Sequence, residues 1–317
     1  MERNHSIDSL KCIMAFLIVL LHTKWAFNYF AEPITRCAVP CFMLISGYMM
    51  AGADENRLKK GINKMLKLLL WSFILFALYS NAGYYLKHHE LIPFTVEDLF
   101  NTIVFNQIPF SGHLWYISSY IYILGIAIFA QKWNIWKWII AICPLLLVIG
   151  LILNAYSIVV FNTDFDLFYS RNFLIRCLPF YVIGLIIKQK EKFLEKFSKK
   201  MLLGGVILSL LISYIELWLL GNKILLPLEH DIYFGTYFYA ICFFLLFIRI
   251  RQDSPNWMSV IGQRDSLYIY ILHPIWCIAL REVIKYMPSI YMYVAPLVVL
   301  LLTIATIKCL RVCRLIK

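Results

Sequence analysis

Charged residues are scarce in this chain of 317 residues, because Asp, Glu, Lys and Arg make up 15% of it while 62% is Ala, Val, Ile, Leu, Met, Phe, Trp, Tyr or Cys. A water-soluble protein uses roughly a quarter charged residues. The apolar side chains also exceed what an interior can hold, so many must face lipid. The composition therefore excludes an ordinary soluble protein and predicts an integral membrane protein.

Several sequence signals for processing, disulfides and metals are also missing. The segment from Met1 to His22 has a polar flank and lacks a small-residue cleavage site, so we expect it to remain as a helix. The nine cysteines show neither a disulfide framework nor a Cys-x-x-Cys pair. Histidines and carboxylates show no metal-ligand spacing, and we expect no metal.

Ten mainly apolar stretches approach the ~20 residues that a helix needs to cross the hydrocarbon. They cover residues 7–23, 33–51, 64–83, 113–131, 136–154, 171–187, 201–220, 232–249, 266–284 and 291–310. No large soluble domain remains between them. We therefore expect residues 1–317 to form a single membrane-embedded domain, all-α, with about ten transmembrane helices.

The 30 Lys and Arg residues are divided unevenly between the two sides of such a chain. The two terminal flanks and the loops after even-numbered stretches hold 21 of them. Cytoplasmic loops are rich in Lys and Arg, so this division places both termini in the cytoplasm. It also explains most of the net charge of +12 by attraction to anionic lipid headgroups, and we expect membrane lipid rather than nucleic acid as a partner.

Two ionisable residues in the first stretch stand out, because such groups at membrane depth are costly and often functional. Lys11 and His22 lie eleven positions apart, within about 20° of three full turns, which puts them on one face about 16 Å apart. They either line one track through the membrane, or Lys11 forms a local i, i+3 pair with Asp8 while His22 lies at the interface.

Further polar residues open later stretches at the outer side. Arg36, followed by Pro40 and Gly47, either snorkels to headgroups or lines a cavity beside an irregular helix. Ser46 and Gly47 permit either close helix approach or a locally opened backbone. His113, Trp115 and Tyr116 form either an aromatic belt or a polar site with a stacking wall.

Arg171 and Asn172 open the sixth stretch at the same level. Because His22, Arg36, His113 and Arg171 share the outer third of the membrane, we expect them to converge on one cavity. Glu216, in the seventh stretch, is the expected partner of one of these cations. His273 should border a cavity, because Pro274 frees a backbone carbonyl one turn earlier.

Lys64 and Lys67 lie three apart in the basic segment that precedes the third stretch. A cytoplasmic stop has the same composition. The alternative is that the two ammonium groups bind phosphates as point charges.

These segments, in this order, resemble the acyltransferase 3 family of ten-helix membrane proteins, which O-acetylate sugars of envelope polysaccharides. The resembling segments are Asp8 to Lys11 followed ten residues later by His22; Arg36 with VPCFMLISGY; Lys64-x-x-Lys67 before a Trp; HLWYI at His113; RNFLIRCLPFYVIG at Arg171; and LYIYILHPIW around His273. Together they span nearly the whole chain.

This sequence departs from the family pattern in two ways. The family usually has arginines where Lys64 and Lys67 stand; the lysines keep the charge but lose bidentate recognition of phosphate. Some members carry a secreted hydrolase-like domain after the last helix, whereas this chain ends at Lys317. The resemblance then implies direct transfer to the acceptor or a separate partner.

The resemblance implies an O-acyltransferase, most simply an O-acetyltransferase, of the bacterial cytoplasmic membrane. It would move the acyl group of cytoplasmic acetyl-CoA or another acyl-CoA to a hydroxyl of an envelope glycan or lipid-linked saccharide. Acyl-CoA is then a co-substrate, with no tightly bound cofactor.

The resemblance also assigns roles to the residues. Lys64 and Lys67 would bind acyl-CoA, together with Lys11, and His22 would be the general base, because a histidine can take a hydroxyl proton at neutral pH. Arg36 or Arg171 would stabilise the oxyanion. The acceptor-binding residues would be His113, Trp115, Tyr116 and Arg171, with His273 open between acceptor contact and packing.

Two other functions compete with this one. A transporter or flippase for a small polar solute such as an amino acid also needs polar residues in a membrane cavity, and some family relatives are suspected of moving amino acids. The two halves of the chain show no convincing repeat, which weakens this alternative. A structural or assembly subunit would leave the His and Arg set unexplained.

Overall fold

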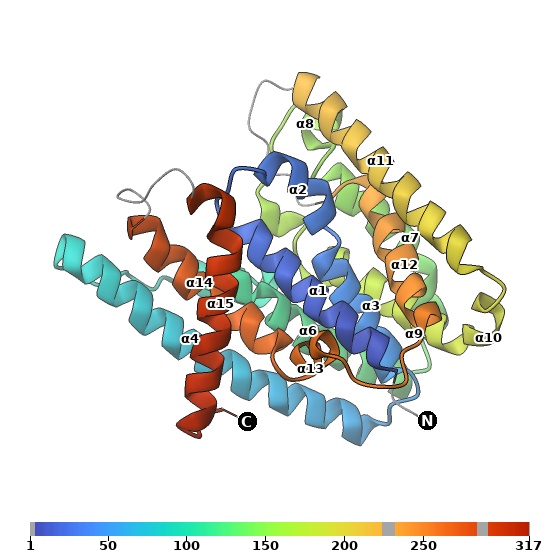
Figure 1. Ribbon diagram of the computed structural model, residues 1–317, viewed down its shortest axis with the longest axis horizontal. Coiled ribbons are helices and arrows are strands. Elements are labelled where there is room, and N and C mark those ends of the chain that lie inside the picture. The colour runs from blue at the N-terminus through green and yellow to red at the C-terminus, as the bar shows by residue number, and fades with distance from the viewer. Residues whose placement is uncertain (1–3, 224–231, 284–290, 317) are drawn as a thin grey trace. The chain divides into compact units, whose positions relative to one another are not determined.

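The computed structural model describes residues 4–223, 232–283 and 291–316 (Figure 1). All regular structure in these ranges is helical, which confirms the all-α prediction. Residue 284 of the ninth predicted stretch lies outside the described residues, as do three of the cations counted above, Arg3, Lys285 and Lys317.

Each of the ten predicted stretches overlaps a helix. These helices are α1 (His5–His22), α3 (Ala38–Met50), α4 (Glu55–His88), α6 (Trp115–Lys132), α7 (Trp136–Ile152), α9 (Leu178–Gln189), α11 (Lys199–Lys223), α12 (Phe234–Ile250), α14 (Ser266–Val283) and α15 (Tyr291–Val312). Among the described residues, five segments are long and apolar enough to cross a membrane: His5–His22, Glu55–His88, Gly112–Lys132, Lys199–Gly221 and Tyr291–Val312. Ten crossings and cytoplasmic termini stay predictions.

Shorter helices lie between these elements. They are α2 (Asn28–Thr35), α5 (Val96–Phe105), α8 (Ser157–Phe161), α10 (Glu191–Leu194) and α13 (Trp257–Arg264), with 3₁₀ turns η1 (Gly112–Leu114) and η2 (Leu167–Tyr169) and a π-helical turn η3 (Phe173–Cys177). The prediction of one helix over 33–51 was wrong, since α2 ends at Thr35 and α3 begins at Ala38. Pro40 has no N–H for the Arg36 carbonyl, and proline is suited to the first turn of a new helix.

The chain divides into two compact units, which we call the terminal unit (residues 1–42 and 192–317) and the central unit (residues 43–191). In the terminal unit α1 packs against α2, α12, α13, α14 and α15, and α11 lies along α12 (Figure 1). In the central unit α4 packs along α6, and α6, α7 and α9 all contact the π-helical turn η3.

Two glycines let α3 and α9 touch through their backbones within the central unit. A Cβ atom on Gly47 would lie 1.9 Å from the carbonyl oxygen of Tyr181, and one on Gly184 would lie 2.2 Å from that of Leu44. Both distances are far inside van der Waals contact, so any side chain at either position would force the helices apart. Of the two possibilities left open at Gly47 from the sequence, the structure shows the close helix approach.

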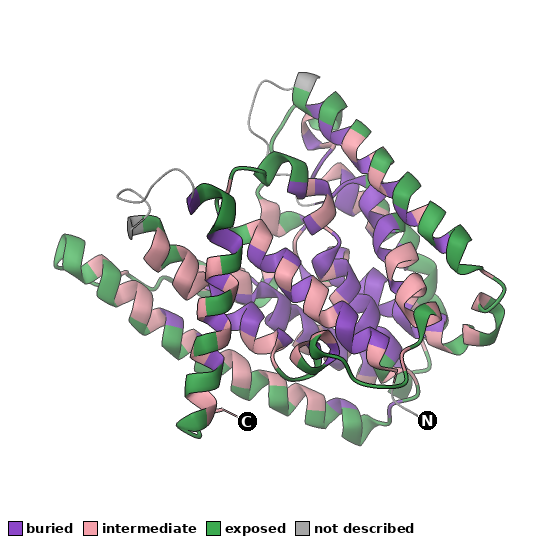
Figure 2. Cartoon of the chain, in the orientation of Figure 1, coloured by how far each residue is buried: buried purple, intermediate pink, exposed green. Residues whose placement is uncertain are grey.

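The helices differ greatly in how much of their apolar surface the chain itself covers. In α1, 56% of the apolar window is buried, against 11% in α4, where Leu70, Trp71 and Leu78 are exposed (Figure 2). Such an extended apolar surface is not stable in water. In α4 it is suited to contact with lipid.

Candidate functional site

The site residues expected from the sequence fall in both units. The terminal unit contains Lys11, His22, Arg36 and His273, whereas the central unit contains Lys64, Lys67, His113, Trp115, Tyr116 and Arg171. The predicted convergence of His22, Arg36, His113 and Arg171 draws on both units and stays a prediction.

His22 is the last residue of α1 and is exposed. The helix ends here because Thr23 adopts an extended conformation and turns its hydroxyl back to the Val19 carbonyl, at 2.7 Å. His22 lies at the edge of a cavity of about 170 Å³ whose other walls come from the segment after α1 and from α14 and α15. An exposed imidazole beside a small cavity can exchange a proton with a bound molecule.

His273 lies directly behind His22, with the two imidazole rings 5.2 Å apart. It is fully buried in α14, and its Nδ1 is 3.0 Å from the Ile269 carbonyl oxygen. Since a carbonyl only accepts, this Nδ1 carries a proton and donates it, which fixes the orientation of the ring. His273 itself is not among the residues that line this cavity, so the prediction that it borders a cavity stays a prediction.

Lys11 forms an ion pair with Asp8, with 3.0 Å between Lys11 Nζ and Asp8 Oδ1. Asp8 is buried, whereas Lys11 is partly exposed. The local i, i+3 pair left open from the sequence is therefore present. It does not exclude the shared helical face with His22, because α1 is one helix from His5 to His22.

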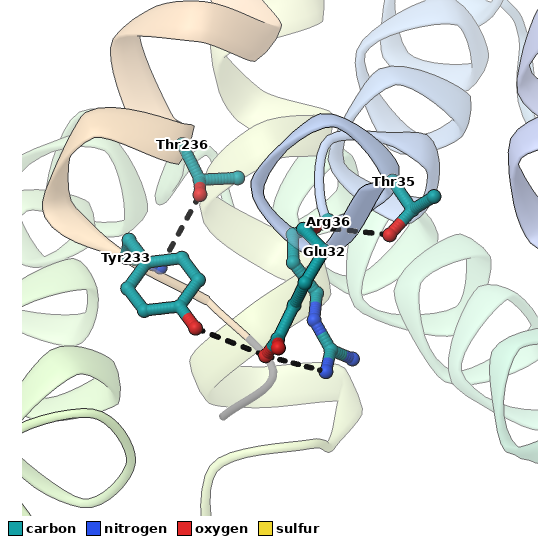
Figure 3. A network of polar contacts seen from close by, with 5 residues as sticks. All are labelled: Glu32, Thr35, Arg36, Tyr233 and Thr236. Atoms are coloured by element: carbon teal, nitrogen blue, oxygen red, sulfur yellow. Dashed lines mark hydrogen bonds and ion pairs between the residues drawn. The ribbon is translucent and has the colours of Figure 1, made fainter. Parts of the chain in front are cut away.

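Arg36 follows α2 and is paired with Glu32 of the same helix, with 3.1 Å between Arg36 Nη2 and Glu32 Oε1 (Figure 3). Tyr233 donates its hydroxyl proton to the same oxygen, at 2.9 Å. The side chains of Arg36 and Glu32 are 11% and 19% exposed, so Arg36 is held inside the terminal unit and does not snorkel into solvent. Glu32 was not among the predicted site residues, although its i, i+4 spacing to Arg36 was a usable signal.

Glu216, expected to pair with a cation, accepts hydrogen bonds from backbone N–H groups at the start of α12. The Phe234 and Gly235 nitrogens each lie 2.8 Å from one of its carboxylate oxygens. A carboxylate at a helix N-terminus satisfies otherwise unpaired donors and complements the helix dipole. Glu216 thereby joins α11 to α12.

His113 precedes α6 in the central unit. Its Nδ1 is 2.8 Å from the Ser111 hydroxyl, and its ring meets Phe76 edge-on at 4.8 Å. Trp115 and Tyr116 follow and are each 8% exposed. Residues of an aromatic belt would face headgroups, so this burial argues against a belt at Trp115 and Tyr116, and the polar site with a stacking wall stays a prediction.

Arg171 is half-buried and precedes an irregular first turn of helix that was not predicted from the sequence. Asn172 accepts hydrogen bonds from the Leu174 and Ile175 nitrogens at 3.0 and 2.9 Å, and the chain then forms the π-helical turn η3 before α9. A π-helical turn is frequent at functional sites. The buried Arg176 lies within it.

Lys64 and Lys67 are both exposed on α4. In the preceding turn Lys59 pairs with Glu55, with 2.5 Å between Lys59 Nζ and Glu55 Oε1. Their exposure keeps both ammonium groups accessible to a phosphate ligand.

All nine cysteines are free thiols, and no group of three or more metal-ligating side chains occurs among the residues that the structure describes.

Comparison with known protein families decides the kind of protein. A family model described as an acyltransferase domain, that of acyltransferase 3, matches residues 4–309. The chain belongs to the acyltransferase 3 family. Membership of this family, together with the apolar helices, indicates a multi-pass membrane protein with an acyltransferase domain.

The curated relatives of this acyltransferase 3 protein carry other names. An amino-acid racemase of Enterococcus faecalis is 24% identical over 90% of this chain and 43% of its own length. A second amino-acid racemase of the same organism is 26% identical over 66% of this chain and 33% of its own length. A serine/alanine racemase of Enterococcus gallinarum is 27% identical over 86% and 40%. The chain thus spans less than half the length of each relative. No solved structure matches.

Proposed function

We propose that this protein is an O-acyltransferase of the bacterial cell membrane that transfers the acyl group of cytoplasmic acyl-CoA, most simply acetyl-CoA, to a hydroxyl of an envelope saccharide. The observation that carries the proposal is the position of His22, exposed at the edge of a cavity and backed by the buried His273, in a chain of the acyltransferase 3 family.

His22 acts as the general base in this proposal. It takes the proton of the acceptor hydroxyl while the oxygen attacks the thioester carbonyl carbon. The C–S bond breaks as the tetrahedral intermediate collapses, and the thiolate of CoA leaves with the proton that His22 had accepted. The ester forms, and His22 returns to its starting state.

Two arginines are the candidates for stabilising the oxyanion. Arg36 carries a guanidinium group with five N–H donors, and its side chain is 11% exposed beside Glu32. Arg171 is half-buried beside the π-helical turn. Such donors are most effective away from bulk water.

The two substrates use different parts of the chain in this proposal. The phosphates of acyl-CoA bind Lys64 and Lys67, with Lys11 as a further cation, and the exposed lysines of α4 support this role. The acceptor binds His113, Trp115, Tyr116 and Arg171. Ten membrane crossings with cytoplasmic termini, supported by the distribution of Lys and Arg, put the acyl-CoA site on the cytoplasmic side.

The test is transfer of radiolabel by the purified protein in liposomes, with labelled acetyl-CoA outside and candidate glycans inside. The wild type is compared with His22→Ala and with His88→Ala, which removes an exposed histidine at the end of α4. We expect label in the glycan for the wild type and His88→Ala, and none for His22→Ala. Glycan labelling by none of the three would contradict the proposal.

A transporter for a small polar solute, such as an amino acid, is the second candidate. It is favoured by the names of the curated relatives, which are racemases of amino acids and share with this chain less than half of their length. A part of such a protein could bring the amino acid across the membrane. Uptake of labelled amino acid into liposomes without any transfer of acyl label would favour this function.

A further inference from the structure

The surface of the cavity beside His22 is mainly apolar, with two cationic side chains among its lining residues. Lys24 and Arg281 both line it, and no Asp or Glu occurs among its described lining residues. The Tyr291 side chain, 7% exposed, also lines it. Its buried hydroxyl has no hydrogen-bond partner among the described residues.

A buried hydroxyl without a partner is costly, because it has lost water and gained nothing. Cations are favoured near helix C-termini, so the ends of α1 and α14 account for Lys24 and Arg281 without any ligand. These helix ends do not explain the Tyr291 hydroxyl. A ligand that accepts a hydrogen bond and carries negative charge explains all three groups.

We infer that the cavity bounded by His22, Lys24, Arg281 and Tyr291 binds the carboxylate of the acceptor. Arg281 and Lys24 supply the positive charge, and the Tyr291 hydroxyl donates a hydrogen bond to the same group. The hydroxyl to be acylated then lies on the His22 side. This assignment names the acceptor class of the proposed transfer, and it rests on that function for the transfer step but not for the binding.

The size of the cavity limits what enters. At about 170 Å³ it is close to the engineered cavity of ~150 Å³ that holds one benzene molecule. The ligand is therefore a small hydroxyl-bearing carboxylate. It can be the uronic-acid end of a saccharide, or a free hydroxy or amino acid, in which case the acceptor does not use the residues of the central unit assigned to it above.

The experiment measures equilibrium binding to the purified full chain in lipid nanodiscs, without acyl-CoA. Two probe pairs differ in the carboxylate: glucuronate against glucose, and L-serine against L-serinamide. We expect saturable binding of at least one carboxylate probe and weaker binding of its partner that lacks the carboxylate. Saturation by glucuronate would identify a saccharide source, and saturation by L-serine would identify a free amino acid.

Variants test the three groups. Arg281→Gln should weaken carboxylate binding by about tenfold or more, as expected for the loss of a charge-assisted contact. Lys24→Gln and Tyr291→Phe should weaken it several-fold. Lys308→Gln, which removes an exposed cation of α15, is the charge-matched control and should leave it unchanged.

Equal binding of glucose and glucuronate, with equal binding of L-serine and L-serinamide, would overturn the inference. So would wild-type carboxylate affinity in Arg281→Gln and Lys24→Gln. Carboxylate binding without acyl transfer would instead reject the proposed function and leave the carboxylate site in place. Acyl transfer to neutral glycans, with a glycan affinity that Arg281→Gln does not change, would instead reject the carboxylate site and leave the proposed function in place.

Discussion

The imidazole rings of His22 and His273 lie 5.2 Å apart, with His22 exposed and His273 fully buried. The backbone contact of His273 at Ile269 fixes its ring, so His273 forms a rigid wall behind a solvent-accessible imidazole. The two residues come from α1 and α14, which are more than two hundred residues apart in sequence. We treat His273 as a positioning residue for His22.

His273→Leu should lower kcat for acyl transfer by about tenfold, equivalent to ~1.4 kcal/mol in the barrier, because His22 loses its fixed neighbour. KM for acyl-CoA should stay unchanged. His273→Asn keeps a donor near the Ile269 carbonyl and should recover part of kcat. Steady-state kinetics of the three proteins measure this, and an equal change of kcat and KM in both variants would reject the positioning role.

Glu32→Gln should destabilise the protein, because it leaves the guanidinium of Arg36 partly buried without its carboxylate partner. We expect a lower Tm by several degrees, equivalent to ~1–3 kcal/mol. The double variant Glu32→Gln with Arg36→Gln should recover part of the loss. Thermal unfolding of all four members of this cycle gives the coupling between the two side chains, and strict additivity would show that the pair contributes nothing.

Gly47→Ala and Gly184→Ala should each prevent stable packing of α3 on α9, because the added Cβ would lie about 2 Å from a carbonyl oxygen of the other helix. Gly83→Ala and Gly125→Ala are matched controls in the same unit, since a Cβ at either position meets no atom within 4 Å. The yield of monodisperse protein measures the effect. Normal yield of both Gly47→Ala and Gly184→Ala would contradict the observed helix contact.

Lys64→Gln with Lys67→Gln should raise KM for acyl-CoA several-fold with little change in kcat, because these exposed lysines are assigned to its phosphates. Lys64→Arg with Lys67→Arg should lower KM, since guanidinium groups bind phosphate bidentately. Lys59→Gln, which removes a cation paired with Glu55 on the same helix, is the control. An unchanged KM in the Gln variant would reject this phosphate site.

Local spacing was enough to predict much of this architecture. Runs of about 20 apolar residues located the main helices, because the thickness of the bilayer sets the length of a crossing helix whatever the rest of the chain does. The Asp8–Lys11 pair followed from an i, i+3 spacing, and the close approach at Gly47 followed from its missing side chain. The helices and the ion pair depend on neighbours in sequence, whereas the residues that Gly47 meets, Tyr181 and Leu185, could not be named in advance.

Features that depend on distant contacts were not predictable. Nothing near His273 indicates that His22 is its neighbour, and nothing near Glu216 indicates that its carboxylate reaches the first turn of α12. Glu32 was overlooked because it lies in a polar segment at the edge of an apolar stretch. Tyr233 donates to the same Glu32 oxygen that pairs with Arg36, and it lies 201 residues after Glu32, so this contact could not be predicted.

The central claim is that His22 is the general base of acyl transfer, and the most direct measurement is the pre-steady-state rate of acyl transfer from labelled acetyl-CoA in His22→Ala. His22 is exposed at a helix end, so its loss should leave folding and acyl-CoA binding unchanged. We predict a fall in transfer rate of about 10²- to 10⁴-fold, the usual contribution of a general base. Transfer at the wild-type rate in a folded His22→Ala protein would contradict the account.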